Sequence, residues 1–201
     1  MTPAVPQSLP RMTSDEFLVW AEGQGESKFE LHDGVVVEKG EPLDGAPKAM
    51  AGERRRHSVV KLNVVRALDI LEPPCRVHVD GIAIRVSDDA AFIPDVLIDC
   101  GAQSDMDSMI AETPTVVVEV LSRSTAHLDL GRKLEGYFAV QSVHHYLLID
   151  PQDRRVIHHQ RDANTIATSI QSSGDIDLTP PGLKVSVDAL WQGLSDEEAP
   201  S

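Results

Sequence analysis

The chain has 201 residues, enough for one domain with a sizeable core, and its 41% hydrophobic and 25% charged residues are ordinary for a globular protein. No apolar run reaches the roughly 18–20 residues that a membrane helix needs, and the start has neither the basic leader nor the apolar stretch of a signal peptide. The formal net charge of −14 means that the molecule as a whole repels DNA, so nucleic-acid binding requires a local basic patch.

The first half of the sequence predicts two helices, a hairpin and two strands, after a loose Pro-rich segment over 1–11. Thr13 is placed to cap the first helix, with Glu16 as its capping-box partner. Asp33-Gly34 is typical of a tight hairpin turn. In chain order the predicted elements are a helix over 13–21, a hairpin over 28–38, a loop over 40–52, a helix over 54–71 that ends at Pro73-Pro74, a strand over 76–86 interrupted near Gly81, and a strand over 92–99.

The second half opens on a β-branched run, 116–121, which indicates a buried central strand. Ser124 or Thr125 is predicted to cap the helix that follows. The other predicted elements are that helix to about Gln141, a hairpin of strands over 145–150 and 155–159, a weaker strand over 165–171, a closing segment over 184–191, and a solvated acidic tail over 192–201. The order α-β-β-α-β-β-β-α-β-β predicts one domain over 12–191, a mixed α/β sandwich with helices packed on a sheet.

The two cysteines, Cys75 and Cys100, lack the spacing of a metal site. They are predicted to be buried free thiols, which suits a reducing cytoplasm. The sequence therefore predicts a cytoplasmic protein that does not enter the membrane.

Two acidic residues lie within apolar strands. Asp95 follows Ile93-Pro94, and Glu119 lies inside the central run. A buried carboxylate is strongly destabilising unless it is paired or binds a cation, so each is either part of an ion pair or a metal ligand. Two convergent carboxylates favour a hard cation, Mg²⁺ or Mn²⁺. Their mutual repulsion predicts that removing either acid leaves the metal-free protein as stable as before, or slightly more stable.

Asp129, Lys133 and Tyr137 share one face of the predicted helix, at successive i,i+4 positions. One interpretation is an ordinary Asp129–Lys133 salt bridge on the helix surface. The other is that Lys133 leans over Asp95 and Glu119, where its ammonium orients the attacking water or stabilises the charge on a phosphorane-like transition state.

These residues resemble the PD-(D/E)XK superfamily of metal-dependent nucleases and, more narrowly, the Uma-type family of predicted restriction endonucleases. The resemblance covers roughly residues 12–190 and implies a restriction-endonuclease-like core, an α+β fold with a mixed β-sheet flanked by helices. The segments that carry it are Phe29-Glu30-Leu31-His32-Asp33-Gly34, His57, Ile93-Pro94-Asp95, Val118-Glu119-Val120-Leu121-Ser122, Asp129 with Lys133 and Tyr137, and Val143 through Tyr146 to Ile149-Asp150-Pro151.

The resemblance implies that Asp95, Glu119 and the carbonyl of Val120 bind the metal. The superfamily's lysine usually lies two residues after the second acid, where this chain has Leu121, and the resemblance implies that Lys133 takes its place. Three residues are assigned supporting roles by the same resemblance: Glu30 as a supporting or second-metal acid, and His57 and Tyr137 as contacts to phosphate or water.

The chain departs from the family pattern at Arg123, where a proline is usual, and at His145, where an acid is usual. Arg54-Arg55-Arg56 is either a phosphate-binding cluster or a set of surface ion pairs. The histidine pairs 144–145 and 158–159 disfavour zinc, because adjacent strand residues face opposite sides of a sheet. His32 and Asp33 are interpreted as turn residues.

The function predicted from these features is Mg²⁺- or Mn²⁺-dependent hydrolysis of phosphodiester bonds in DNA, by a homodimer. The main alternative is a catalytically silent module with a nuclease fold that binds a protein or a nucleic acid, and the acidic charge favours it. A third possibility is a hydrolase that acts on another phosphate ester. Fold alone does not decide between them.

Overall fold

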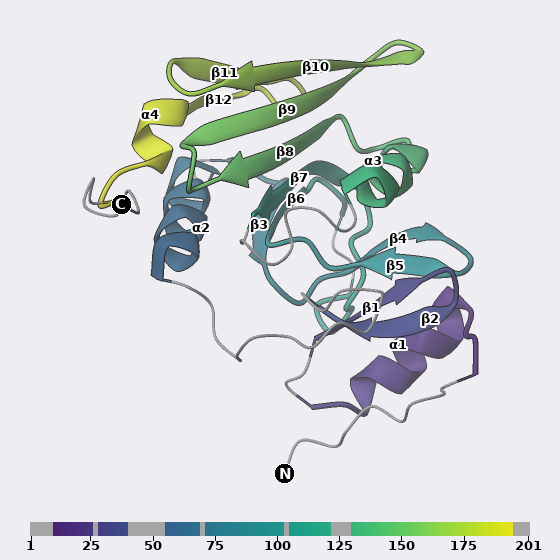
Figure 1. Cartoon of the computed structure of the whole chain (residues 1–201). Helices are drawn as coiled ribbons and strands as arrows, with labels where there is room; N and C mark the ends of the chain where they lie inside the picture. The colour runs from purple at the N-terminus through teal and green to yellow at the C-terminus, as the bar shows by residue number, and fades with distance from the viewer. Residues whose placement is uncertain are drawn as a thin grey trace.

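The structure is a computed structural model, and it describes residues 10–25, 28–39, 55–68, 71–102, 105–121 and 130–194 (Figure 1). The helices are α1 Ser14–Glu22, α2 Arg55–Leu68, α3 Leu130–Ala139 and α4 Val187–Leu190. The strands are β1 Phe29–His32, β2 Val35–Glu38, β3 Arg76–Val79, β4 Ile84–Ser87, β5 Ala90–Phe92, β6 Val96–Asp99, β7 Pro114–Val120, β8 His145–Asp150, β9 Arg155–Asp162, β10 Thr165–Gln171, β11 Asp175–Leu178 and β12 Leu183–Ser186.

The centre of the fold is a 6-stranded sheet in the order β10-β9-β8-β7-β6-β3. β7 and β8 are parallel, and the other neighbours are antiparallel. A parallel pair needs a crossover connection, which here contains α3. Every residue of β7 is buried, as its β-branched sequence predicts.

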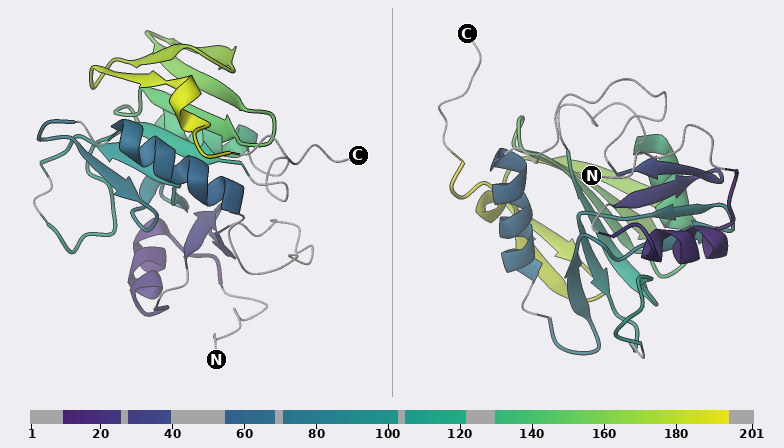
Figure 2. Two further views of the ribbon diagram at one scale, coloured as in Figure 1. Left: turned by 90° about the vertical axis from the view of Figure 1, so that its left-hand side faces the viewer. Right: turned by 90° about the horizontal axis from the view of Figure 1, so that it is seen from below.

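Two apolar cores lie on opposite faces of this sheet. On one face α2 packs through Val60, Val64 and Leu68, and β12 and α4 complete that layer. On the other face Phe138 of α3 packs together with Phe92 of the small sheet. Figure 2 shows the large sheet between α2 with α4 on one side and the small sheet with α1 on the other.

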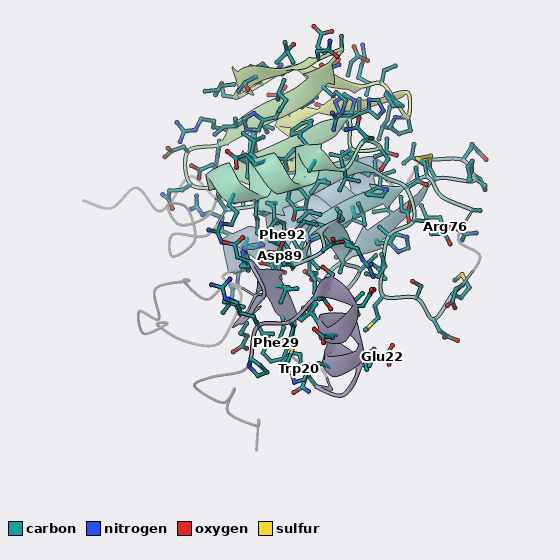
Figure 3. The ribbon with its side chains drawn as sticks, turned by 90° about the vertical axis from the view of Figure 1, so that its right-hand side faces the viewer. Trp20, Glu22, Phe29, Arg76, Asp89 and Phe92 are labelled. Atoms are coloured by element: carbon teal, nitrogen blue, oxygen red, sulfur yellow. A yellow bond between two sulfur atoms is a disulfide. The ribbon has the colours of Figure 1, made fainter. Side chains whose placement is uncertain are left out.

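The small sheet has the order β2-β1-β5-β4 and is covered by α1. Thr13 and Glu16 form the predicted capping box at the start of α1. Trp20 of α1 meets Phe29 of β1 edge to face, with ring centroids 5.0 Å apart (Figure 3). The predicted hairpin turn is present as well, and Asp33 and Gly34 both have positive φ, which suits the right-handed twist of the two strands.

Two predicted strands are each divided between the two sheets, and the interruption predicted near Gly81 in the first of them is present. The predicted strand over 76–86 becomes β3 and β4, because Asp80 and Gly81, both with positive φ, break it. The predicted strand over 92–99 becomes β5 and β6, and Pro94, which has no N–H to donate, lies at the break. Asp95 therefore lies where the chain passes from the small sheet to the large one. β11 was not predicted.

The cysteine prediction is wrong, because Cys75 and Cys100 form a disulfide. β3 and β6 are antiparallel with Arg76 opposite Asp99, so the residues just beyond this pair are cross-strand neighbours. Disulfides persist mainly in oxidising compartments, so the cysteines no longer support the predicted cytoplasmic location. Within the described residues, no helix is long and apolar enough to span a membrane.

Candidate active site

Asp95, which directly precedes β6, lies opposite Glu119 of β7. β6 and β7 are antiparallel with Val96 opposite Val118, and one further step of this register places Asp95 across from Glu119. The backbone N–H of Val120 donates to Asp95 Oδ2 at 2.8 Å, which holds the two strand ends together. Both acids are buried, with relative exposures of 5% for Asp95 and 8% for Glu119. The structure thus brings together the two acids predicted to bind a metal.

Asp95 is surrounded by cationic and donor groups. Lys39, which directly follows β2, donates from Nζ to Asp95 Oδ1 at 2.8 Å. His57, in the first turn of α2, has its Nε2 3.4 Å from Asp95 Oδ2. Burial alone would raise the pKa of Asp95, but the His57 contact and the Lys39 charge outweigh it and lower the pKa below the ordinary value. Asp95 is therefore held as a carboxylate.

Glu119 has a different environment. Its Oε1 accepts hydrogen bonds from Lys133 Nζ at 2.9 Å and from Tyr137 Oη at 2.9 Å. Burial raises its pKa above the ordinary value, and the Lys133 charge opposes that effect without cancelling it, while Asp95 adds to it. The two acids of the site therefore have pKa values shifted in opposite directions, which is typical of functional sites.

Lys133 lies between two acids. Besides Glu119, its Nζ donates to Glu30 Oε1 at 3.0 Å. Burial would lower its pKa, but Glu119 and Glu30 raise it well above the ordinary value, so Lys133 is an ammonium. Tyr137 follows at i+4 on the same face of α3, as the helical spacing predicts. The alternative partner, Asp129, and the predicted caps at 124 and 125 lie outside the described residues.

Glu30 is held by donors on both oxygens. Oε1 accepts from the backbone N–H of Ile93 at 3.0 Å as well as from Lys133, and Oε2 lies 3.2 Å from Nε2 of His32. Burial would raise its pKa, but Lys133 and the His32 contact lower it to about 2. Of the two roles predicted for Glu30, this arrangement favours support of Lys133 over binding of a second metal.

His32 is not a turn residue, contrary to the sequence interpretation. It is the last residue of β1, is buried, and contacts Glu30. Only Asp33 belongs to the turn. The prediction was wrong because the strand extends up to the turn residues, and a short hairpin pattern does not mark where pairing ends.

Lys39 and Asp80 are the site residues that sequence reasoning missed. Lys39 Nζ lies 3.4 Å from Asp80 Oδ1 in addition to its bond with Asp95. Asp80 also accepts from Lys61 at 3.0 Å and pairs with Lys28 at 3.4 Å. A lysine after a hairpin and an aspartate before a glycine look like surface and turn residues, so only the packing of the two sheets reveals this cluster.

A divalent cation fits between Asp95 and Glu119 only with water or backbone oxygens as further ligands. Within the described residues no group of three or more His, Cys, Asp and Glu side chains is arranged to hold a metal. Mg²⁺ usually keeps several waters and uses one or two carboxylates, so this pair suits it. Glu119 Oε2 accepts no hydrogen bond from the part of the chain that the structure describes, and it is the oxygen left for a cation.

The remaining candidates lie apart from these acids or have other partners. Arg56 donates to the carbonyl oxygen of Pro151 at 3.2 Å, and Arg54 lies outside the described residues. His145 and His158 face each other on β8 and β9, with Nδ1 and Nε2 3.0 Å apart. Burial lowers the pKa of both to about 4, so they form a neutral buried pair at pH 7.

Comparison with known proteins identifies relatives along most of the chain. An uncharacterized protein of Synechocystis sp. (strain ATCC 27184 / PCC 6803 / Kazusa), slr1290, is 27% identical over 199 residues, which cover 96% of this chain and 97% of the relative. A second uncharacterized protein of that organism, sll1609, is 29% identical over 131 residues, or 63% of this chain and 74% of the relative.

A solved structure is similar in fold. It is described as "a putative nuclease belonging to DUF820" from Anabaena variabilis ATCC 29413, with a TM-score of 0.64 and 16% sequence identity, and the match covers 90% of this chain and 97% of that chain. The predicted fold class, a mixed sheet flanked by helices, is confirmed.

The family resemblance drawn from the motifs is tested by a family model. The model of the Uma2 family, described as "Putative restriction endonuclease", matches residues 14–189. That range includes all of the acids and lysines of the site. Since the match spans most of the sequence, the chain belongs to the Uma2 family.

Proposed function

We propose that the chain is a metal-dependent endonuclease that hydrolyses phosphodiester bonds in DNA. The observation that carries the proposal is the meeting of Asp95 and Glu119 across two strands, with the Lys133 ammonium on Glu119. Buried acids with oppositely shifted pKa values beside a cation are typical of functional sites, and a pair of carboxylates can hold a divalent cation. The family description supports the same reaction class.

In this proposal Asp95, Glu119 and the carbonyl oxygen of Val120 hold Mg²⁺ or Mn²⁺. A divalent cation bound there would supply an activated water and neutralise charge on the scissile phosphate. Among the protein groups, His57 and the N–H of Val120 keep the carboxylate of Asp95 oriented. Tyr137 does the same for Glu119 by donating to Oε1.

Lys133 is proposed to act on the water or the phosphate. An ammonium has three protons to donate, and within the described residues two are directed at Glu119 and Glu30. The third is available to orient a water or to stabilise charge on a phosphate oxygen. Glu30, whose two oxygens both have donors, is proposed to position Lys133.

The lysines around the site do not by themselves form the local basic patch that DNA binding requires at a net charge of −14. Lys28, Lys39, Lys61 and Lys133 all contact acids of this cluster, and Lys28 is 42% exposed. Because Glu30, Asp80, Asp95 and Glu119 pair with these lysines, the cluster has no excess of positive charge within the described residues, and a phosphate would need a metal ion or further cations.

The main alternative is a silent nuclease fold that binds a partner. Lys39 and Lys133 already neutralise Asp95 and Glu119 without a metal, and a purely structural ion-pair cluster would look the same. The overall acidity also favours a protein partner over DNA.

Incubation with single-stranded and double-stranded DNA under Mg²⁺ or Mn²⁺ separates the two functions. We expect the wild-type protein to cleave only when the metal is present, and the Asp95→Ala variant to be inactive. Equal product from both proteins would show a contaminating nuclease. No product from either protein, together with unchanged Mn²⁺ binding in the variant, would leave the silent module as the function.

A homodimer is proposed as the form that acts on duplex DNA, because a two-fold axis places two equivalent sites on opposite strands. Multi-angle light scattering is expected to give about twice the 21.9 kDa chain mass. A monomer mass over a wide range of concentrations would contradict the prediction without affecting the chemistry of the single site.

A further inference from the structure

Lys39 occupies the position on Asp95 that a metal ion would need. Its Nζ is 2.8 Å from Asp95 Oδ1, and its side chain is only 15% exposed. The other oxygen of Asp95 already accepts from the N–H of Val120 and lies 3.4 Å from His57 Nε2. A cation that binds Asp95 must therefore compete with the Lys39 ammonium for Oδ1.

Asp80 is a second acid that can pair with Lys39. Asp80 Oδ1 is 3.4 Å from the same Nζ, so a small movement would exchange Asp95 for Asp80 as the closer partner. The backbone N–H of Asp80 donates to the carbonyl oxygen of Asp95 at 3.2 Å, which couples the positions of the two residues. Asp80 Oδ2 is engaged by Lys61 and Lys28, which leaves Oδ1 for Lys39.

We propose that Lys39 is a built-in counter-cation of the metal site: it holds Asp95 when no metal is bound, and it transfers to Asp80 when a divalent cation binds. This inference rests on the proposed function, because it assumes that Asp95 is a metal ligand. Lys39 is then a positioning residue that opposes metal binding, and Asp80 is a positioning residue that favours it.

The reason for the exchange is electrostatic. Two cations that share one buried carboxylate repel each other strongly, since little water lies between them to screen the charges. A buried ammonium is also destabilising unless an acid pairs with it. The exchange to Asp80 removes the repulsion and leaves Lys39 paired, so neither state contains an isolated buried charge.

Opposite effects of two substitutions on Mn²⁺ affinity test the proposal. Lys39→Met removes the competitor and should tighten Mn²⁺ binding about 10-fold, whereas Asp80→Asn removes the alternative partner and should weaken it about 10-fold. Isothermal titration calorimetry on metal-free protein measures both. Lys28→Met is the matched control: it also removes a lysine that pairs with Asp80, but Lys28 does not contact Asp95 within the described residues, so the affinity should change much less.

The double variant Lys39→Met/Asp80→Asn separates the exchange from a general charge effect. If Asp80 acts by accepting Lys39, Asp80→Asn has no effect once Lys39 is absent. If Asp80 only adds negative potential, Mn²⁺ binding weakens equally in both backgrounds, and the proposed exchange is wrong. Lys39→Gln provides a second test should the methionine variant not fold.

Thermal melts give a readout that does not depend on calorimetry. In EDTA, Lys39→Met should melt below the wild type, because Asp95 loses its nearest cation, and saturating Mn²⁺ should raise its melting temperature more than that of the wild type. Unchanged or weaker Mn²⁺ binding in Lys39→Met, with binding still lost in Asp95→Ala, would overturn this inference alone. Absence of Mn²⁺ binding in every variant would overturn the proposed metal site as well.

Discussion

Replacing Asp95 with asparagine is expected to abolish DNA cleavage and to destabilise the metal-free protein, whereas replacing Glu119 with glutamine should abolish cleavage and leave the metal-free protein at least as stable. Each substitution removes a proposed metal ligand, so the rate should fall by about 10³-fold or more. The stability effects differ because the two carboxyl groups have pKa values shifted in opposite directions.

The effect at Asp95 follows from its lowered pKa. The folded state binds the ionised form more tightly than the unfolded chain does, so this group stabilises the fold above the ordinary aspartate pKa of about 3.9. That stabilisation is lost as the pH falls through the lower pKa of the folded state. Within the described residues Asp95→Asn leaves Lys39 paired with Asp80 alone, and we expect a loss on the order of 3 kcal/mol near pH 7.

The effect at Glu119 has the opposite sign. Its raised pKa means that the folded state disfavours the carboxylate, so the destabilisation grows as the pH rises from the ordinary glutamate pKa of about 4.3 through the higher folded value. Glutamine removes that unfavourable charge and still offers an oxygen to Tyr137, while Lys133 keeps Glu30. We expect the free energy of unfolding at pH 7 to change by less than about 1 kcal/mol, or to rise.

Chemical denaturation in EDTA at pH 7, repeated near pH 5, measures both variants against the wild type. The loss of stability caused by Asp95→Asn should persist at both pH values. The effect of Glu119→Gln on stability should be smaller at the lower pH. Similar large losses for both variants would indicate that Glu119 is a structural ion pair. The sequence predicted near-neutral effects for both acids from their repulsion, and the structure revises that expectation for Asp95, because the His57 contact and the Lys39 charge outweigh the effect of burial there.

The two acids could be predicted from sequence because each breaks a local rule, and the helix lysine because the family resemblance and the helical spacing both indicate it. Asp95 and Glu119 are charged residues inside apolar strands, and Lys133 and Tyr137 share a helical face. Each of these signals is contained in a short stretch of the sequence. They predicted the right elements: β8 is present with the predicted bounds, β7 and β9 with bounds shifted by a few residues, and α3 is present within the described residues.

The rest of the site could not be predicted because it depends on contacts between distant segments. Lys39 meets Asp95 across 56 residues, and the Lys61–Asp80 contact spans 19 residues and joins α2 to a turn between two sheets. The breaks at Asp80-Gly81 and at Pro94 move the chain from one sheet to the other, a change that alternation within a strand does not record. The cysteine pairing depends in the same way on the register of β3 and β6.

Lys133→Met is the second substitution with a large expected effect, and turnover should fall by about 10²- to 10³-fold. Nothing else among the described residues places an ammonium on Glu119, so the charge at that point is lost. Lys133→Arg should recover little, because a planar guanidinium cannot match the compact ammonium between Glu30 and Glu119. The matched control on the same helix is Arg132→Met, since Arg132 is 44% exposed and pairs with Asp33, which is not one of the proposed site acids.

Stability has to be separated from turnover in this variant, because Lys133→Met leaves two buried acids without their shared cation. We expect a lower melting temperature in EDTA, and the double variant Lys133→Met/Glu30→Gln should recover part of it by removing one buried charge. If Lys133 acts in the reaction, the double variant stays inactive even though part of its stability returns, and it still binds Mn²⁺ through Asp95 and Glu119. If turnover returns together with stability, Lys133 serves only to neutralise Glu30 and Glu119, and the lysine has no part in the chemistry.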